Sequence, residues 1–409
     1  MRREYSRSLM CSLVVLTAVF AARPVAADGA PPTITVRCDR GESLARTLDR
    51  KPDASDLTIV VKGVCQENVT IKRGGVTLLA DPSGGAISAP DVTSDAVHVT
   101  GDDVTIDGLS VTGGRGGIVA SGARRLTLRR CTVRNTQRTG VFFFQAAGGM
   151  VDGCTVQNAG RDGIALEGAS ATVINSTISQ NTRAGVTVAN GSSGRIGLDA
   201  SSGGPAGNVI GPNGSTGLLI SGASAVAAAN TISGNGTDPA ALFGRAGVTI
   251  VNGAQAQLPG GNTISTSAGA GIFVRGSALL MGNVNPDLGT VLNTVSGNGT
   301  ASASQPGVEL FLNSSGDLRN VVVDGNVGNG ILVSTNSSMT LNNVTVTNSG
   351  RDGIQLVFGS SLFAAPPVSN VVNNAGFGLN CLDGESSVFG FVYTFGNGAG
   401  DVSDTCTGF

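Results

Sequence analysis

The stretch Asn158–Ser170, NAGRDGIALEGAS, returns almost unchanged as Asn348–Ser361, NSGRDGIQLVFGSS. Both copies contain a glycine followed by a triplet of apolar, any and apolar residues. Most copies of this triplet are spaced 22–25 residues apart. The triplet follows Gly117, Gly140, Gly163, Gly185, Gly217, Gly247, Gly271, Gly307, Gly330, Gly353 and Gly378.

A second phrase precedes most copies of the triplet, as STISQN, NTISGNG, NTVSGNG or VTVTNSG. Short runs of alternating apolar residues, broken by Asn and Gly, are typical of strands joined by tight turns. A period in the low twenties predicts one coil of a solenoid per repeat. We expect apolar residues at every second strand position to fill the interior, with glycine allowing close backbone approach or positive φ at the corners.

The composition agrees with an all-β solenoid. The 409 residues include 62 Gly, one His and no Trp, and only 13% are charged, whereas ordinary globular domains carry about 25% charged residues. Good helix formers occur in no long run, which excludes a mainly helical protein.

The repeats resemble those of the right-handed parallel β-helix proteins, the pectin-lyase-like architecture, over nearly all of the chain after its N-terminal segment. The resemblance implies a right-handed parallel β-helix solenoid with a short N-terminal capping helix. It does not choose a function, because lyases, hydrolases, esterases, epimerases, adhesins and envelope proteins share this architecture.

The N-terminus has the pattern of a secretory signal peptide. Basic residues precede an apolar run from Leu9 to Ala22 that is too short for a membrane span, and we expect cleavage after Ala27. The protein is therefore predicted to be secreted, whether extracellular, periplasmic or at the cell surface. In GESLARTLDR, from Gly41, Leu44 and Leu48 predict a short amphipathic capping helix. The predicted parts are a signal peptide (1–27), an N-terminal cap (28–68), the β-helix repeats (69–380) and a C-terminal cap (381–409).

Export permits disulfides. Cys38 with Cys65, and Cys381 with Cys406, are predicted to close the two caps. Cys131 and Cys154 stand in matching phrases, CTVRNTQ and CTVQNAG, so they should stack on neighbouring coils. Parallel side-chain directions disfavour a bridge between stacked residues, and we expect both to be free thiols.

The strand after each glycine should have an apolar outer face, on which enzymes of this fold usually work. The carboxylates on that face, Glu167 and Glu309, are five coils apart, roughly 24 Å. Glycosidase carboxylates lie within about 5–10 Å of each other, so this face excludes a two-carboxylate hydrolase. Phe142, Phe144, Phe273 and Phe311 point outward, and we expect them to be covered by the long connections Gly185–Gly217, Gly217–Gly247 or Gly271–Gly307, or by a second molecule.

Two further clusters have a structural interpretation. HVTGDDVTIDG, with His98, Asp102, Asp103 and Asp107, could hold calcium or an acid and base, but Asp and Gly are also the residues from which turns are built. We favour the turn interpretation. Cys131 and Cys154 lack nearby His partners, so no metal site is predicted.

One pattern of residues is not needed to form the repeated coil. Two residues before the glycine, consecutive coils carry Arg115, Arg138, Arg161 and Arg183, and Arg245 and Arg351 occupy the same slot later. We predict that the four consecutive arginines bind a ligand. A solvated turn position would also accept arginine, which is the structural alternative.

The favoured function is a secreted scaffold that binds an extended extracellular polymer, most simply an acidic polysaccharide, without a recognisable catalytic site. One alternative is a polysaccharide lyase or uronate epimerase, in which Arg removes a proton next to a carboxylate neutralised by calcium or by another Arg. Another is a structural or adhesive envelope protein that docks a protein partner, or itself, on the apolar sheet face. The acidic balance of the chain gives no support to a nucleic-acid partner. No cofactor is expected, apart from calcium in the lyase alternative.

Overall fold

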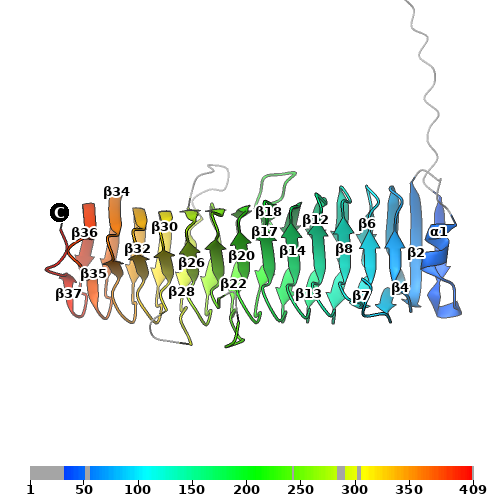
Figure 1. Cartoon of the computed structure of the whole chain (residues 1–409), viewed down its shortest axis with the longest axis horizontal. Helices are drawn as coiled ribbons and strands as arrows, with labels where there is room; N and C mark the ends of the chain where they lie inside the picture. The colour runs from blue at the N-terminus through cyan, green and yellow to red at the C-terminus, as the bar shows by residue number, and fades with distance from the viewer. Residues whose placement is uncertain (1–31, 51–55, 242–243, 283–290, 302–304, 408–409) are drawn as a thin grey trace, which may run out of the picture. The chain divides into compact units, whose positions relative to one another are not determined.

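The computed structural model describes residues 32–50, 56–241, 244–282, 291–301 and 305–407. The predicted signal peptide, residues 1–27, lies outside the described residues. The chain from Pro32 onward forms one compact unit, a stack of coils that Figure 1 shows side on. Within the described ranges, no helix is both long and apolar enough to cross a membrane.

Each coil contributes one short strand to a parallel sheet, which has fourteen strands in the described part of the chain. We call it the triplet sheet, because its strands from β8 to β35 begin with or contain the repeated apolar triplet. Its strands are β3 (Val69–Ile71), β5 (Val97–Val99), β8 (Ile118–Ser121), β11 (Val141–Phe144), β14 (Ile164–Glu167), β17 (Val186–Ala189), β20 (Leu218–Ser221), β23 (Val248–Val251), β26 (Ile272–Arg275), β29 (Val308–Phe311), β31 (Ile331–Ser334), β33 (Ile354–Val357), β35 (Phe377–Cys381) and β37 (Gly400–Val402).

The rest of each coil contributes to a second parallel sheet, which has 23 strands among the described residues. In the middle coils this contribution is a pair of short strands, and in the last coils it is one long strand. The strands are β1 (Thr33–Arg37), β2 (Leu57–Cys65), β4 (Val76–Ala89), β6 (Thr105–Asp107), β7 (Ser110–Gly113), β9 (Leu126–Arg129), β10 (Thr132–Arg134), β12 (Gly148–Asp152), β13 (Thr155–Gln157), β15 (Ser170–Ile174), β16 (Thr177–Ser179), β18 (Ser193–Ile196), β19 (Val209–Ile210), β21 (Ser224–Ala227), β22 (Thr231–Ser233), β24 (Gln255–Leu258), β25 (Thr263–Ser265), β27 (Ala278–Met281), β28 (Asn293–Ser296), β30 (Ser315–Asp324), β32 (Ser338–Thr347), β34 (Ser361–Val372) and β36 (Ser387–Phe395).

The register of the triplet sheet confirms the predicted inward and outward positions. Val141 pairs with Ile164, and Phe142 pairs with Ala165. Val141 and Ile164 follow the glycine and are buried, whereas Phe142 points outward and is half-buried. The glycine itself is required by close approach, since a Cβ added at Gly140 would lie 2.7 Å from the carbonyl oxygen of the next coil's glycine.

The interior also contains polar ladders, which the sequence pattern does not predict. Asn208, Asn230, Asn262 and Asn293 stack in successive coils and are buried. The Asn208 N–H donates to Asn230 Oδ1 over 3.1 Å, and the Asn230 N–H donates to Asn262 Oδ1 over 3.1 Å. These amides satisfy backbone groups at a corner that water does not reach.

The N-terminal end is closed by a 3-10 helix η1 (Cys38–Arg40) and a short helix α1 (Leu44–Asp49). Leu44 and Leu48 are buried, which confirms the predicted capping helix. The Glu67 carboxylate accepts the Leu44 N–H over 2.6 Å and the Ser43 hydroxyl over 2.7 Å. The disulfide between Cys38 and Cys65 is present as predicted.

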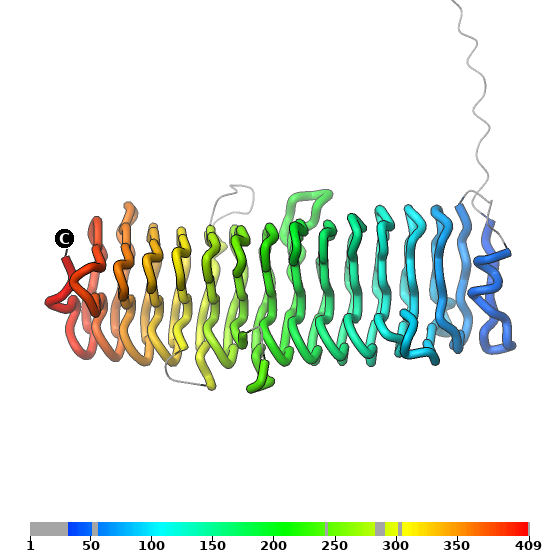
Figure 2. Tube along the Cα trace, in the orientation of Figure 1, coloured from blue at the N-terminus to red at the C-terminus, as the bar shows by residue number. Residues whose placement is uncertain are grey.

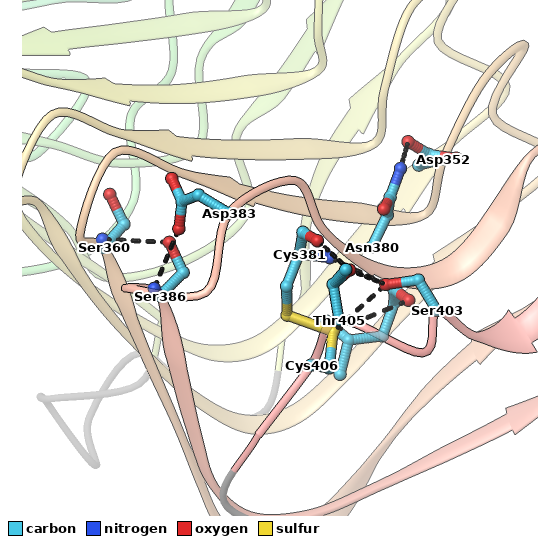
Figure 3. Close-up of a disulfide and its surroundings, with 10 residues drawn as sticks. Asp352, Ser360, Asn380, Cys381, Asp383, Ser386, Ser403, Thr405 and Cys406 are labelled. Carbon is cyan, nitrogen blue, oxygen red and sulfur yellow. Dashed lines mark hydrogen bonds between the residues drawn. A yellow bond between two sulfur atoms is a disulfide. The ribbon is translucent and has the colours of Figure 1, made fainter.

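The C-terminal end carries the second predicted disulfide, between Cys381 and Cys406, with Cα atoms 5.0 Å apart (Figure 3). Ser403 Oγ accepts the Cys381 N–H over 3.0 Å. Cys131 and Cys154 are buried free thiols, which confirms the prediction for the middle coils. Their mutual hydrogen bond and their burial raise the pKa of the Cys131 thiol, so it stays protonated.

Candidate functional site

Backbone hydrogen bonds hold the four predicted arginines one above another. The Arg138 N–H donates to the Arg115 carbonyl over 2.7 Å, and the Arg161 N–H donates to the Arg138 carbonyl over 3.2 Å. The Arg183 N–H continues the row to the Arg161 carbonyl over 3.0 Å. The four arginines, which occupy equivalent turn positions in the sequence, are therefore stacked in a column, which we call the arginine column.

All four side chains line one hollow of about 470 Å³ on the outer face of the triplet sheet. We call it the basic hollow. Its floor includes the outward residues of β8, β11 and β14, and its wall is the arginine column. The lining residues are Asp95, Arg115, Gly116, Val119, Arg138, Thr139, Phe142, Phe144, Arg161, Asp162, Glu167 and Arg183.

The positive charge of three arginines of this column, Arg115, Arg138 and Arg161, is poorly compensated. Among the described residues, no carboxylate makes an ion pair with Arg115, Arg138 or Arg161 within 4.0 Å. The guanidinium groups of Arg115 and Arg161 lower the pKa of Arg138, which lies between them. The arginines therefore repel one another across neighbouring coils.

Two aspartates lie directly after the arginine slot and share the hollow. Asp95 Oδ1 accepts the Gly116 N–H over 3.1 Å, and Asp162 Oδ1 accepts the Ala184 N–H over 3.1 Å. Each carboxylate thus bonds to the coil above it. Burial raises the pKa of Asp162, whereas a hydrogen bond with His98 lowers the pKa of Asp95.

His98 joins the edge of this site through Asp95. Its Nδ1 lies 3.0 Å from Asp95 Oδ2, and its strand neighbour in the next coil is Val119, a residue of the hollow. Nothing in the sequence indicates that His98, Asp95 and the arginines meet. The pattern that could have indicated it is an Asp in the slot after Arg, as in the phrase Arg161-Asp162-Gly163.

The other members of the cluster HVTGDDVTIDG lie at a bend, which holds Asp102 and Asp103, and at the end of β6, which is Asp107. Asp102 Oδ1 accepts the Arg124 N–H over 2.8 Å. Asp103 pairs with the exposed Arg125. Asp107 accepts a 2.8 Å hydrogen bond from Arg130 Nε. The structure therefore agrees with the turn interpretation of these aspartates.

The later arginines of the same slot lie apart from the basic hollow. Arg245 Nε donates to the Gly236 carbonyl over 2.8 Å and lines a second hollow of 450 Å³. Arg351 occupies the turn slot near the C-terminal end, where its N–H donates to the Gly328 carbonyl over 3.2 Å. Of the six arginines of this slot, the four consecutive ones line one common hollow.

The outward phenylalanines are half-buried, and Phe273 lies beside described residues of the long connections. Phe273 lines the second hollow with Ala241 and Gly244 of one connection and with Ala301 and Gln305 of another. The Gly185–Gly217 connection makes its excursion between β18 and β19 of the other sheet, with a bridge from Leu198 to Pro205. Figure 2 shows that loop protruding from the opposite side of the stack to the excursion just before β23.

The phenylalanines near the basic hollow have a different environment. Phe142 and Phe144 stack on each other, with ring centres 4.9 Å apart, and both line the hollow. No long connection contributes to its lining, so the expectation of a covering connection is wrong for this pair. The two rings are part of the floor of a concave surface.

The two strand carboxylates lie in separate hollows. Glu167 lines the basic hollow and Glu309 lines the second one. Glu167 is on β14 and Glu309 on β29, with four strands of the triplet sheet between them. Burial raises the pKa of Glu309. The separation agrees with the exclusion of a glycosidase that uses this pair.

The basic hollow offers no converging set of metal ligands. The one group of three acidic or sulfur ligands among the described residues is Cys38, Cys65 and Glu67. Its cysteines form a disulfide, and its carboxylate caps α1. That group lies at the N-terminal cap and not in the basic hollow.

Comparisons with known proteins concern the whole solenoid. The family model described as right-handed beta helix region matches residues 58–202 and 206–389. No curated protein sequence matches the chain. The A-module of an Azotobacter vinelandii mannuronan C-5 epimerase superposes with a TM-score of 0.51 at 14% identity, covering 88% of this chain and 94% of that one.

Two other solved structures are less similar. A periplasmic alginate epimerase has a TM-score of 0.47 at 12% identity, covering 85% of this chain and 76% of that one. A pectate lyase has a TM-score of 0.41 at 12% identity, covering 73% of this chain and 80% of that one. At such identities the superposition with the A-module shows the fold, and the chemistry of this chain has to come from its own residues.

Proposed function

The chain belongs to the right-handed β-helix family, and from this premise we propose that it is a secreted scaffold whose basic hollow holds an extended acidic polysaccharide. The observation that carries the proposal is the column of Arg115, Arg138, Arg161 and Arg183 along one concave surface. The A-module that shares the fold is named for mannuronan, and we carry that ligand class over as part of the proposal.

The spacing of the column suits a polyanion with one charge per unit. Strands of neighbouring coils lie about 4.8 Å apart, close to the rise of one sugar in an extended polyuronide. Consecutive guanidinium groups could therefore meet consecutive carboxylates. Arginine suits this task because its planar fork binds a carboxylate through two parallel hydrogen bonds.

Electrostatics also favours a bound polyanion. Arg138 lies between two other arginines that lower its pKa, and a row of bound carboxylates would relieve that repulsion. The two disulfides fit the oxidising compartment in which an extracellular polysaccharide is met. Binding through exposed charges should weaken as salt rises, since such charges are screened over about 8–10 Å at physiological ionic strength.

The test is retention on immobilised polygalacturonate or alginate. Replacing Arg138 and Arg161 together by Gln should abolish retention and leave the melting temperature nearly unchanged, because both side chains lack ion pairs. The matched control is Arg124→Gln with Arg129→Gln, which removes the same charge from exposed positions outside the basic hollow. Equal retention by the first pair and wild type, or equal losses in both pairs, would contradict the proposal.

A polysaccharide lyase or uronate epimerase is the second candidate. Two groups in or beside the hollow favour it: Arg138, whose pKa is lowered, and His98, which is held by Asp95. Either could take up the proton next to a uronate carboxylate that a neighbouring arginine neutralises. Elimination would then break the glycosidic C–O bond and leave a carbon–carbon double bond, whereas return of a proton on the opposite face would invert the centre.

Absorbance of unsaturated uronate products distinguishes elimination from binding, and proton NMR of the recovered polymer detects epimerisation. The scaffold proposal expects retention with neither signal. A product signal that disappears in the His98→Gln or Arg138→Lys variant would show that the protein is an enzyme and would reject the scaffold proposal. The absence of retention and of product on a panel of acidic glycans would leave the adhesive alternative.

A further inference from the structure

The last two strands of the larger sheet carry an exposed row of aromatic side chains. The sequence of β36, SVFGFVYTF, buries Val388 and Val392 and exposes Phe389, Phe391, Tyr393 and Phe395. Phe363 of β34 is the register partner of Phe389. The exposed fractions are 52% for Phe363, 52% for Phe389, 64% for Phe391, 48% for Tyr393 and 63% for Phe395. We call these five residues the C-terminal aromatic patch.

The solenoid does not require aromatic residues at these positions. In the middle coils the strands β16, β22 and β25 all read TIS, and in each of them Thr and Ser flank one buried Ile. These Thr and Ser residues are the register equivalents of Tyr393 and Phe395, so in the middle coils those two outward positions carry hydroxyl groups. The aromatic row on β36 therefore serves something other than coil stacking.

The patch is large enough for a protein interface. A Phe or Tyr side chain buries about 150–250 Å² when it is fully covered, so five rings that are half exposed present on the order of 500 Å². This lies at the upper end of the apolar patches of monomers, about 300–600 Å². With a polar rim, it approaches the roughly 800 Å² per partner of a standard interface.

The patch is also free of charge. Neither Ser361–Val372 nor Ser387–Phe395 contains a charged residue. Two identical copies of this surface can meet without like-charge repulsion, and a surface without Lys or Arg has no attraction for an anionic lipid or glycan. A second copy of the chain is thus the occupant that this surface fits.

We propose that the C-terminal aromatic patch is a self-association surface, on which two copies of the chain pack patch against patch about a two-fold axis. The surface lies on β34 and β36, whereas the basic hollow lies over β8, β11 and β14. Dimerisation therefore leaves both basic hollows accessible and makes the protein bivalent for any polymer they hold. The self-association itself does not depend on the proposed function.

Sedimentation velocity of the mature protein tests this surface. Wild type should sediment as a dimer at tens of micromolar and dissociate on dilution. Phe391→Ser with Phe395→Ser should sediment as a monomer over the same range. The matched control is Phe358→Ser, which removes an equally exposed ring, 67%, at a turn outside the patch and should remain a dimer. A wild type that is monomeric up to about 100 μM, a dimeric double variant or a monomeric Phe358→Ser would overturn the proposal.

A second variant guards against a folding artefact. Tyr393→Asp places two negative charges against each other across the interface and should give a monomer that becomes dimeric again at high salt. An unchanged melting curve shows that the coils remain intact, and unchanged retention on polyuronide separates this result from the function of the basic hollow. Flotation of the wild type with neutral phosphatidylcholine vesicles, in place of dimerisation, would assign the patch to a lipid surface and reject the second copy.

Discussion

At the scale of single residues, the fold holds charged groups of the basic hollow in electrostatically unfavourable positions. Asp162 is kept partly out of water because its Oδ1 accepts the Ala184 N–H of the next coil. The two neighbouring arginines of its column, Arg161 and Arg183, compensate this burial only in part, so its pKa remains raised. Asp162 therefore has two roles: its hydrogen bond joins two neighbouring coils, and its carboxyl group contributes to the charge of the hollow.

Replacing Asp162 by Asn tests this link. Because burial raises the pKa of Asp162 above its ordinary 3.8, the folded protein binds that proton more tightly than the unfolded chain. The favourable contribution is complete below the unfolded pKa and is lost as the pH rises through the folded pKa. The variant keeps the acceptor oxygen and removes the ionisation, so it should be more stable than wild type at pH 7.

Chemical denaturation at pH 7 and at about pH 3 measures the difference. The advantage of the Asn variant should disappear in acid, where Asp162 is protonated in both states. Asp95→Asn is the matched control, because the pKa of Asp95 is lowered, and its substitution should destabilise the protein at pH 7. A gain from Asp162→Asn that persists unchanged in acid would show that the effect is one of packing.

At the scale of structural elements, the coils are joined by internal ladders of side-chain amides as well as by backbone bonds. In a second ladder Asn213 Nδ2 donates to Asn235 Oδ1 over 3.0 Å, and Asn298 Nδ2 donates to Asn326 Oδ1 over 3.0 Å. Between Asn235 and Asn298 the position is occupied by Ser267. Its buried hydroxyl has no hydrogen-bond partner among the described residues, so the ladder is interrupted there.

Ser267→Asn should fill this gap and join Asn235 to Asn298. By analogy with Asn235, whose amide donates to the Ile210 carbonyl over 3.0 Å, the new amide should reach the Ile232 carbonyl, and its oxygen should accept from Asn235. We expect a gain of about 1 kcal/mol in the free energy of unfolding, the net value of a typical hydrogen bond. Urea denaturation measures it.

The reverse change provides the control. Asn235→Ser opens a further gap in the same ladder and leaves buried backbone groups without partners. It should cost roughly 1–3 kcal/mol. A loss of stability in both variants would mean that the corner at Ser267 has no room for an amide, and that the interruption is imposed by packing.

At the scale of the whole molecule, the solenoid is a one-dimensional stack, and its ends are where it should open first. Each coil contacts mainly its neighbours, so stability is close to a sum of coil and interface contributions. The disulfides lie at the two ends, one between Cys38 and Cys65 and the other between Cys381 and Cys406. Both therefore fasten the segments that cover the terminal strand edges.

Removing either disulfide should destabilise the coils at the end of the stack where that disulfide lies. The bridges join cysteines 27 and 25 residues apart, and loops of this size correspond to about 3 kcal/mol. Cys38→Ser with Cys65→Ser, and Cys381→Ser with Cys406→Ser, should each expose amides of the neighbouring terminal coils to hydrogen exchange and leave the central coils protected.

Cys131→Ser is the control, because Ser176 already occupies the equivalent position two coils later and accepts the Cys154 N–H over 3.1 Å. It should leave the exchange at both ends as in wild type. Uniform loss of protection along the whole chain in the disulfide variants would contradict a stack that opens from its ends.

The sequence by itself determines the coil, because each repeat contains the residues that form its own turn and its own strand. The glycine before the triplet and the alternation of apolar residues predict the inward face of Val141 and Ile164, which the structure confirms. Cysteine positions at the two ends likewise predict both disulfides. These features depend on local spacing and on one repeated register, and both can be read along the chain.

Only the tertiary structure decides what meets across coils. It places the local pair of His98 and Asp95 beside the arginine column, turns corner asparagines into buried ladders, and leaves Phe142 and Phe144 uncovered by any connection. The directions of turn side chains and the paths of long connections depend on neighbours about 22–36 residues away in the chain. A pattern of spacings shows which residues occupy equivalent slots, whereas the contacts between slots depend on how side chains of different coils share the same space.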